Sequence, residues 1–203
     1  MTTESPSNPA EDRAWVTVQT PLSLAELRKF CGDLERLYRI NPYSEFQVWK
    51  ETGPGQIHME FRNLSTERDL SLDLKLVQES DTAFHVAYAQ GIKAATRFEL
   101  GAVEGGSTLT ITDDYNQLPA DERARRLDEV DKSLAAWGQA IFDYLRRHKR
   151  WGWIAPWRWY MRRLWVPMKP SARRIAWLVV LITVVEFLFF VFVALIWWIE
   201  HRV

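Results

Sequence analysis

Few side chains able to do chemistry fall where this chain can bury them. Asp113 and Tyr88 share the alternating positions of the apolar residues around them, and they could meet at the mouth of a cavity as an acid or base and a hydrogen-bond donor. Asp113 also suits a turn at the end of a strand, in the stretch TDDYN, and we favour this interpretation. His58 and His85 take the opposite positions, beside charged residues, and are expected to be solvated.

Other reactive arrangements are missing from the sequence. No pair of His, Cys or acidic residues has metal-ligand spacing, no glycine-rich loop could hold phosphates, and no serine lies in a nucleophile elbow. Cys31 is the only cysteine, which excludes an internal disulfide and fits a reducing compartment. Its side chain is expected to pack as a small buried apolar group on a helix. The sequence therefore implies no metal, no cofactor and no catalytic residue, and we expect a protein that is not an enzyme.

The elements that would position these residues are mostly strands. From 45 to 115, six short segments alternate apolar and polar residues and are separated by turn signals such as GPG, STER and EGG, which predicts an antiparallel meander. The stretch AWVTVQTP predicts one further strand before them. The apolar set begins with Phe46 and Val48 and ends with Leu109 and Ile111, so one face of the sheet should be buried and the other wet.

Helices are predicted before and after the meander. The stretch SLAELRKFCGDLERLYRINPY opens with a capping box from Ser23 to Glu26, and Gly32 with Asp33 should divide it into two short helices. A helix of about thirty residues should lie across the concave side of the sheet. Its apolar stripe consists of Leu127, Val130, Leu134, Trp137, Ile141 and Leu145. Gly138 on this stripe is either simply tolerated or leaves space between helix and sheet.

A pocket between the sheet and the long helix would hold a largely apolar ligand through burial. The same residues could instead close on one another as an ordinary core, and the sequence does not separate the two outcomes because both need the same apolar pattern. The candidate lining residues are Met59, Phe61, Leu74, Phe84, Tyr88, Phe98, Asp113, Trp137, Gly138 and Ile141.

Charge divides the chain into two parts. Residues 1–144 carry 15 Lys and Arg against 24 Asp and Glu, a net charge of −9, whereas residues 145–203 carry 11 against 2, a net charge of +9. The second part includes 25 residues, Ile175 to Ile199, with a single ionisable group, and as a helix they would be about 37 Å long. This stretch predicts a transmembrane helix, since a soluble chain of this length has no second layer to cover a helix that is apolar all round.

Eight Lys or Arg between Lys149 and Arg174 precede the span, and only EHRV follows it. The positive-inside bias therefore places the N-terminal domain in the cytoplasm and the C-terminus outside, as a single-pass tail anchor in the cell (inner) membrane. We expect no earlier span and no signal peptide, because the first residues have acids, Pro and Ser but no apolar run.

The stretch KRWGWIAPWRWYMRRLW joins the two parts. Basic residues interleaved with aromatics can bind single-stranded nucleic acid, but a segment that ends next to a span must lie near lipid headgroups, so we expect no nucleic-acid partner. Pro156 to Val166 predicts a short interfacial helix on anionic lipid, with its packing onto the soluble domain as the alternative. The candidate membrane-interface residues are Trp151, Trp153, Trp157, Arg158, Trp159, Arg162, Arg163 and Trp165.

Glu186 is the one acid near the middle of the predicted span, where a carboxyl costs on the order of 2.5 to 3.5 kcal/mol on insertion scales. As a neutral carboxyl it could hydrogen-bond a partner helix, either in a homodimer or with another membrane protein. It could equally be a passenger on a strongly apolar helix.

The order of strand, two short helices, six strands and a long helix resembles the START-like helix-grip superfamily, also called SRPBCC, which includes polyketide cyclase-like and coenzyme-Q-binding members. The resemblance covers about Trp15 to Arg150 and rests on this order with the stretches CGDLERLYRINPY and TRFELGAVEGGSTLTITDDY. It implies an α+β fold with a curved antiparallel sheet of about seven strands wrapped on the long helix. It also implies an apolar ligand between sheet and helix, and it carries over no catalytic residue.

The expected organisation is a disordered N-terminus (1–12), a START-like domain (13–150), a Trp- and Arg-rich interfacial segment (151–170), a transmembrane helix (171–199) and a short external tail (200–203). The expected function is non-catalytic transport, sensing or chaperoning of a lipid or other hydrophobic small molecule by a membrane-tethered cytoplasmic domain. The alternatives are a regulatory or scaffolding membrane protein that acts through protein partners and, last, an enzyme of the cyclase or hydrolase type.

Overall fold

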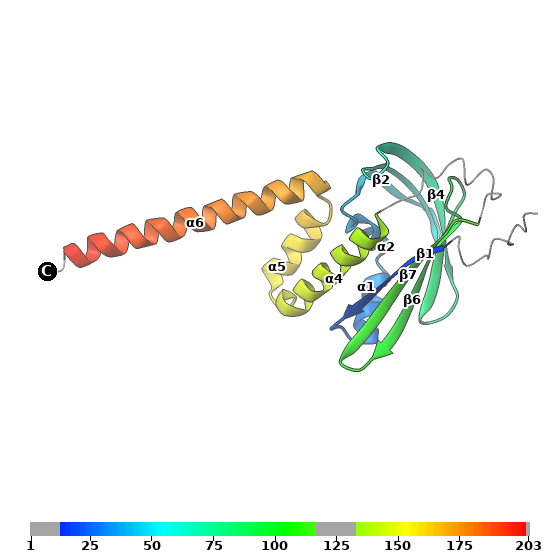
Figure 1. The fold of residues 1–203 in the computed structure, drawn as a ribbon, viewed down its shortest axis with the longest axis horizontal. Helices are drawn as coiled ribbons and strands as arrows, with labels where there is room; N and C mark the ends of the chain where they lie inside the picture. Colours follow the sequence, from blue (N-terminus) through cyan, green and yellow to red (C-terminus); the bar gives the residue numbers. More distant parts are fainter. Residues whose placement is uncertain (1–12, 117–132, 202–203) are drawn as a thin grey trace, which may run out of the picture. The chain divides into compact units, whose positions relative to one another are not determined.

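The computed structural model describes residues 13–116 and 133–201, which form two compact units that divide between Pro167 and Met168 (Figure 1). The described residues of the first unit form seven strands. These are β1 (Arg13–Thr20), β2 (Ser44–Gly53), β3 (Gln56–Asn63), β4 (Arg68–Gln78), β5 (Ala83–Tyr88), β6 (Ala95–Val103) and β7 (Gly106–Asp114). Its helical elements are α1 (Leu24–Cys31), α2 (Leu34–Arg39), α4 (Leu134–Trp151), α5 (Ala155–Tyr160) and the π-helical turn η3 (Met161–Trp165).

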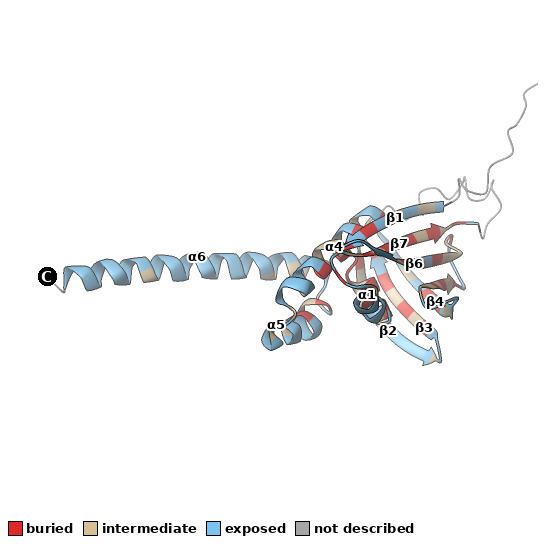
Figure 2. Ribbon diagram, turned by 90° about the horizontal axis from the view of Figure 1, so that it is seen from below, coloured by how far each residue is buried: buried red, intermediate tan, exposed pale blue. Residues whose placement is uncertain are grey.

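The seven strands form one antiparallel sheet in the order β1-β7-β6-β5-β4-β3-β2. Strands β2 to β7 form the predicted meander, and β1 closes onto β7 with Val18 opposite Leu109. Helices α1, α2 and α4 lie on the inner side of the curved sheet (Figure 1), where the buried residues of the strands gather (Figure 2). The predicted α+β helix-grip architecture is confirmed.

The pairing of β2 with β3 is irregular at two places, between Phe46 and Val48 and between Glu51 and Gly53, and the first of these changes the predicted alternation. A β-bulge between Phe46 and Val48 inserts a residue, so that Val48 lies opposite Glu60 of the wet face. Trp49 takes the inner position instead and packs its ring 5.7 Å from that of Tyr38. The predicted inward position of Val48 is therefore wrong, because one extra residue reverses the sides of all that follow.

The two short helices after β1 form as predicted. The Ser23 side chain accepts a hydrogen bond from the Glu26 backbone, and the Glu26 carboxylate accepts one from the Ser23 backbone, which completes the capping box. Gly32 ends α1, and the Asp33 side chain accepts from the backbone N–H of Arg36 to begin α2. Leu27 and Leu37 of these helices are fully buried in the core.

Helix α4 is the described part of the predicted long helix. The earlier part of that prediction, with Leu127 and Val130, lies outside the described residues. At Gly138 a Cβ atom would come within 2.7 Å of a Val16 methyl group, so glycine lets α4 lie directly against β1. Neither simple tolerance nor ligand space accounts for Gly138, because the methyl groups of Val16 and Val18 already fill that position.

The second unit consists of the 31-residue helix α6 (Pro170–Glu200), the one helix among the described residues that is long and apolar enough to cross a membrane. At 1.5 Å per residue it is about 46 Å long, and its apolar residues are uncovered along the whole length. Glu186 lies on this helix with its side chain exposed among apolar neighbours.

Candidate functional site

A cavity of about 100 Å³, the grip cavity, opens between the sheet and the start of α4. Four of the ten residues proposed from sequence line it: Met59, Phe61, Tyr88 and Trp137. The other lining residues are Tyr38, Asn41, Ser44, Phe46, Asn63, Thr66, Arg68, Leu70, Leu72, Gln90, Gly91, Ile92, Lys93 and Tyr115. The cavity thus has an apolar floor on β2 to β4 and a polar rim at the ends of these strands.

The other apolar candidates lie elsewhere in the core. Phe84 and Phe98 stack with ring centroids 4.8 Å apart, and Phe98 also meets Trp137 edge to face at 5.9 Å. Phe98 and Ile141 have no exposed surface, and Leu74 is buried on β4. The core alternative applies to these residues, because their side chains fill the space between sheet and helix.

Trp137 forms the boundary between the closed core and the cavity. Its indole N–H donates to the Leu37 backbone carbonyl at 2.9 Å, which fixes the ring between α2 and the sheet. The rings of Tyr38 and Trp137 lie 5.3 Å apart. Nearby, the Asn41 side chain donates to the Ser133 hydroxyl at 2.9 Å and holds the start of α4 against the end of α2.

A chain of hydrogen-bonded polar groups lies beside the cavity, and we call Tyr38, Tyr88, Thr96, Asp113 and Lys93 the polar wall. Tyr38, Tyr88 and Lys93 line the cavity, whereas Thr96 and Asp113 are not among its lining residues. The Thr96 hydroxyl donates to the Asp113 carboxylate at 2.6 Å. Since a hydroxyl has one proton, the Tyr88 hydroxyl must donate to Thr96 (2.9 Å) and that of Tyr38 to Tyr88 (2.8 Å). The chain of donors therefore ends on Asp113.

Asp113 is buried and paired. Its side chain is 1% exposed, and the Lys93 ammonium lies 2.7 Å from its second carboxylate oxygen, with Lys93 itself 17% exposed. Asp113 and Tyr88 are joined through Thr96 and do not contact each other directly. The interpretation of Asp113 as a turn acid is wrong, because Asp113 lies within β7, where Lys93 and Thr96 satisfy the carboxylate inside the protein.

The two phenols of the polar wall are donors and not bases. Burial raises the pKa of Tyr38 well above its ordinary value, and burial also raises the pKa of Tyr88, where nearby Lys93 acts in the opposite direction. Both groups therefore remain protonated at neutral pH. The wall can orient a polar atom of a ligand at the cavity rim, and Lys93 is its most accessible member.

Sequence reasoning missed three members of the polar wall. Tyr38 is at helical spacing among apolar residues and Thr96 takes an inward position on β6, so the pattern treats both as ordinary core. Lys93 lies in the turn before β6, where a lysine is usually solvated. The signal available was the inward acid at 113, since a buried carboxylate requires a cationic or hydroxyl partner.

Comparison with solved structures places this fold. The crystal structure of the Zhui aromatase/cyclase from a Streptomyces species matches with a TM-score of 0.54, 12% identity, and coverage of 68% of this chain and 95% of that one. Protein Ms6760 from Mycobacterium smegmatis matches with a TM-score of 0.50 and 14% identity, over 70% of this chain and 96% of that one. A START superfamily protein from M. smegmatis has a TM-score of 0.49 and 14% identity, over 66% and 98%.

The chain has a START-like helix-grip fold. No sequence-family model matches the START-like chain, and no curated protein matches it either. At identities of 12 and 14% the likeness concerns the fold, and the chemistry of the neighbours remains theirs. In this fold the grip cavity lies between the sheet and α4.

The Trp- and Arg-rich segment packs onto the START-like domain. Met161 and Val166 are buried, and Trp157, Tyr160 and Trp165 pack against the core, with Trp165 5.8 Å from the ring of Tyr144. The apolar face predicted for the interfacial helix therefore lies on protein, as in the alternative left open from the sequence. A tight turn permits this, because at Gly152 any Cβ would overlap the His148 carbonyl.

The remaining candidates for a membrane interface stay on the surface of the START-like domain. Trp153 is 78% exposed and Trp159 60% exposed, and Trp151 is exposed as well. Arg158, Arg162 and Arg163 are also exposed, on α5 and η3. These residues stay available to a ligand or a lipid surface, whereas Trp157 and Trp165 are partly buried against the core.

Proposed function

We propose that this protein is a membrane-tethered START-like domain that binds one end of a hydrophobic small molecule in the grip cavity and performs no chemistry on it. The observation that carries the proposal is the apolar cavity between sheet and α4, bounded by the polar wall. At about 100 Å³ it is smaller than the roughly 300–1,000 Å³ of sites that enclose drug-sized ligands. The expected ligand inserts a ring or a short apolar branch and leaves a polar group at the rim.

The absence of chemistry is part of the proposal. Tyr38 and Tyr88 hold their protons, and the Asp113 carboxylate is engaged by Lys93 and Thr96. A general base needs a free acceptor within hydrogen-bond reach of the substrate. Each of these groups instead has an internal partner, which suits recognition of a ligand.

Native mass spectrometry of the full-length protein in non-ionic detergent tests the binding, with organic extraction of what copurifies. The variant Ile92→Trp should fill the cavity and remove the ligand, because Ile92 is buried and lines it. Leu76→Trp is the matched control, since Leu76 packs on the same face of the sheet outside the cavity. Equal retention by both variants, or no ligand in the unchanged protein, would contradict the proposal, and so would conversion of the bound molecule that Asp113→Asn abolishes.

Tethering through α6 is the second part of the proposal. A helix whose apolar residues are uncovered along about 46 Å requires an apolar solvent, and a hydrocarbon core of about 30 Å supplies it. The Lys and Arg bias before the helix favours a cytoplasmic START-like domain at the inner membrane. The full-length protein should stay in the membrane pellet after carbonate extraction, and protease added outside intact cells should leave the domain uncut. Release by carbonate would contradict tethering.

A further inference from the structure

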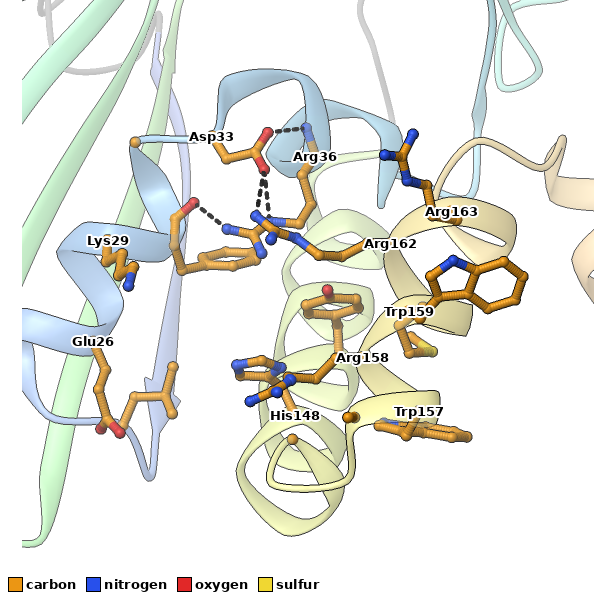
Figure 3. Close-up of a pocket in the computed structure, with 17 residues that line it drawn as sticks. Glu26, Lys29, Asp33, Arg36, His148, Trp157, Arg158, Trp159, Arg162 and Arg163 are labelled. Atoms are coloured by element: carbon orange, nitrogen blue, oxygen red, sulfur yellow. Dashed lines mark hydrogen bonds and ion pairs between the residues drawn. The ribbon is translucent and has the colours of Figure 1, made fainter.

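A second hollow, far larger than the grip cavity, lies on the other side of the helices of the START-like domain. It has a volume of about 980 Å³ and lies between α1 and α2 on one side and the end of α4, α5 and η3 on the other (Figure 3). We call it the basic groove. The basic and imidazole side chains that line it are Lys29, Arg36, His148, Arg158, Arg162 and Arg163.

Positive charge in the basic groove exceeds the negative charge available to it. Five Lys and Arg line it against Glu26 and Asp33, an excess of three. Glu26 is already engaged, because its carboxylate accepts from the Ser23 backbone and from the Lys149 ammonium at 3.1 Å. Lys149 does not line the groove, so the carboxylate that remains for the lining cations is Asp33.

Asp33 joins the two walls of the groove. Its carboxylate lies 3.4 Å from the Arg36 guanidinium of α2 and 4.0 Å from that of Arg162 on η3 (Figure 3). Within the described part of the chain, no carboxylate forms an ion pair with Lys29, Arg158 or Arg163. Among the described residues, Asp33 is thus the one carboxylate that neutralises the guanidinium groups lining the groove, and it leaves most of their positive charge uncompensated.

His148 lines the groove, and the pKa of its imidazole responds to the positive charges around it. It is half-buried, and burial together with the charges of Arg36, Arg162 and Arg158 lowers the pKa of its imidazole, while Glu26 acts in the opposite direction. The ring lies parallel to that of Tyr144, with centroids 6.2 Å apart. Arg158 points to the same region from α5 (Figure 3). Positive charge therefore converges on one place from two sides.

Arginine guanidinium groups match phosphate, because their planar N–H donors engage two oxygens at once. The exposed side chain of Trp159 lines the same groove. Tryptophan rings are enriched at the level of lipid headgroups in membrane proteins. Six residues separate Arg163 from Pro170, where the apolar helix begins, and the seven residue steps between them reach at most about 25 Å. A phospholipid headgroup is thus a ready source of phosphate.

We propose that the basic groove binds a phosphate group, supplied by an anionic phospholipid headgroup or by free phosphate, between Arg36 of α2 on one wall and Arg158 and Arg162 on the other. This site is separate from the grip cavity and does not depend on the ligand bound there. In this proposal the Trp- and Arg-rich segment forms one wall of a defined site, and α1 and α2 form the other wall.

Histidine-ring NMR of the full-length protein tests the proposal, because the chain has four histidines and only His148 lines the groove. One arm adds inorganic phosphate to the protein in non-ionic detergent at constant ionic strength. The other compares nanodiscs of phosphatidylcholine with nanodiscs that also contain phosphatidylglycerol. The phosphate should shift the His148 resonance and raise its pKa, while His58 on the sheet stays unchanged.

Two double variants separate a defined site from general electrostatics. Arg158→Gln with Arg162→Gln should weaken the His148 response at least about tenfold, since charge-assisted hydrogen bonds are lost. Arg146→Gln with Arg147→Gln removes the same charge from the exposed side of α4 and should leave the response in place. A response to phosphate in detergent identifies free phosphate as sufficient, and a response confined to phosphatidylglycerol nanodiscs identifies the headgroup.

Either of two results would overturn the proposal. The first is a His148 resonance that neither phosphate nor phosphatidylglycerol moves. The second is an equal loss of response in the two double variants. Arg163→Gln, at the edge of the groove, provides a milder change should the first double variant fold poorly by circular dichroism.

Discussion

Removing Lys93 should destabilise the START-like domain far more than neutralising its partner Asp113. Lys93→Met keeps an unbranched side chain in the rim but removes the ammonium 2.7 Å from a carboxylate that is 1% exposed. The carboxylate then keeps the Thr96 hydroxyl as its hydrogen-bond donor in the polar wall. Breaking a buried pair from this side costs about 3–5 kcal/mol, because a charge remains without compensation in the interior.

Asp113→Asn is milder for two structural reasons. The amide oxygen can still accept from the Thr96 hydroxyl, and the Lys93 ammonium, 17% exposed, can turn to water. We expect a loss of about 1–2 kcal/mol. In the double variant no charge is buried, so Asp113→Asn should recover about 2 kcal/mol of the loss caused by Lys93→Met. The same substitution thus destabilises the unchanged protein and stabilises the Lys93→Met variant.

Urea unfolding of the full-length protein in non-ionic detergent at pH 7 measures the four free energies of unfolding. The midpoints should fall in the order unchanged protein, Asp113→Asn, double variant and Lys93→Met, or with the middle two close together. A Lys93→Met midpoint equal to that of the unchanged protein would refute the argument. So would an Asp113→Asn substitution that lowers the stability of Lys93→Met still further.

Three further outcomes are expected. Gly138→Ala should cost about 1–2 kcal/mol in urea unfolding despite its better helix propensity, and should become stabilising when Val16→Ala removes the overlapping methyl groups; additive effects would contradict this. The folded state lowers the His148 pKa, so the unfolded chain binds more protons and the free energy of unfolding falls from about pH 7 to 5; His148→Gln should reduce this loss. The opposite holds for His58, because Asp73 and Glu60 raise its pKa in the folded state. Its contribution to stability is present below about pH 6.5 and is lost as the pH rises. Glu186→Leu should reduce self-association of α6 in a crosslinking assay, and an unchanged dimer fraction would make the acid a passenger.

The fold could be predicted because its signals are local and periodic. The capping box at Ser23, the helix break at Gly32 and the alternation through six strands each determine a structure from neighbouring residues. The bulge beside Val48 escaped prediction, since inserting one residue leaves an equally plausible alternation on either side. Gly138 escaped as well, because its reason is a strand far away in sequence, β1, that approaches the helix.

The candidate site was less predictable than the fold. An inward apolar pattern is the same for a closed core and a lined cavity, so Phe84 and Phe98 could not be distinguished from Met59 and Phe61 before their packing was known. Likewise, an amphipathic segment has an apolar face whether lipid or protein covers it. The burial of Met161 resolves that choice through tertiary contacts.

Four residues, 166–169, connect the π-helical turn to the apolar helix, and an extended chain of that length reaches only about 14 Å. A short tether makes a binding event between attached partners intramolecular, with an effective concentration in the millimolar range. If the apolar helix is inserted, recognition sites on the folded domain would meet the bilayer as though it were dissolved at that concentration. A weak affinity of the START-like domain for the bilayer would then suffice for high occupancy of its lipid-binding groups. The same domain without the apolar helix would lose this occupancy by dilution alone.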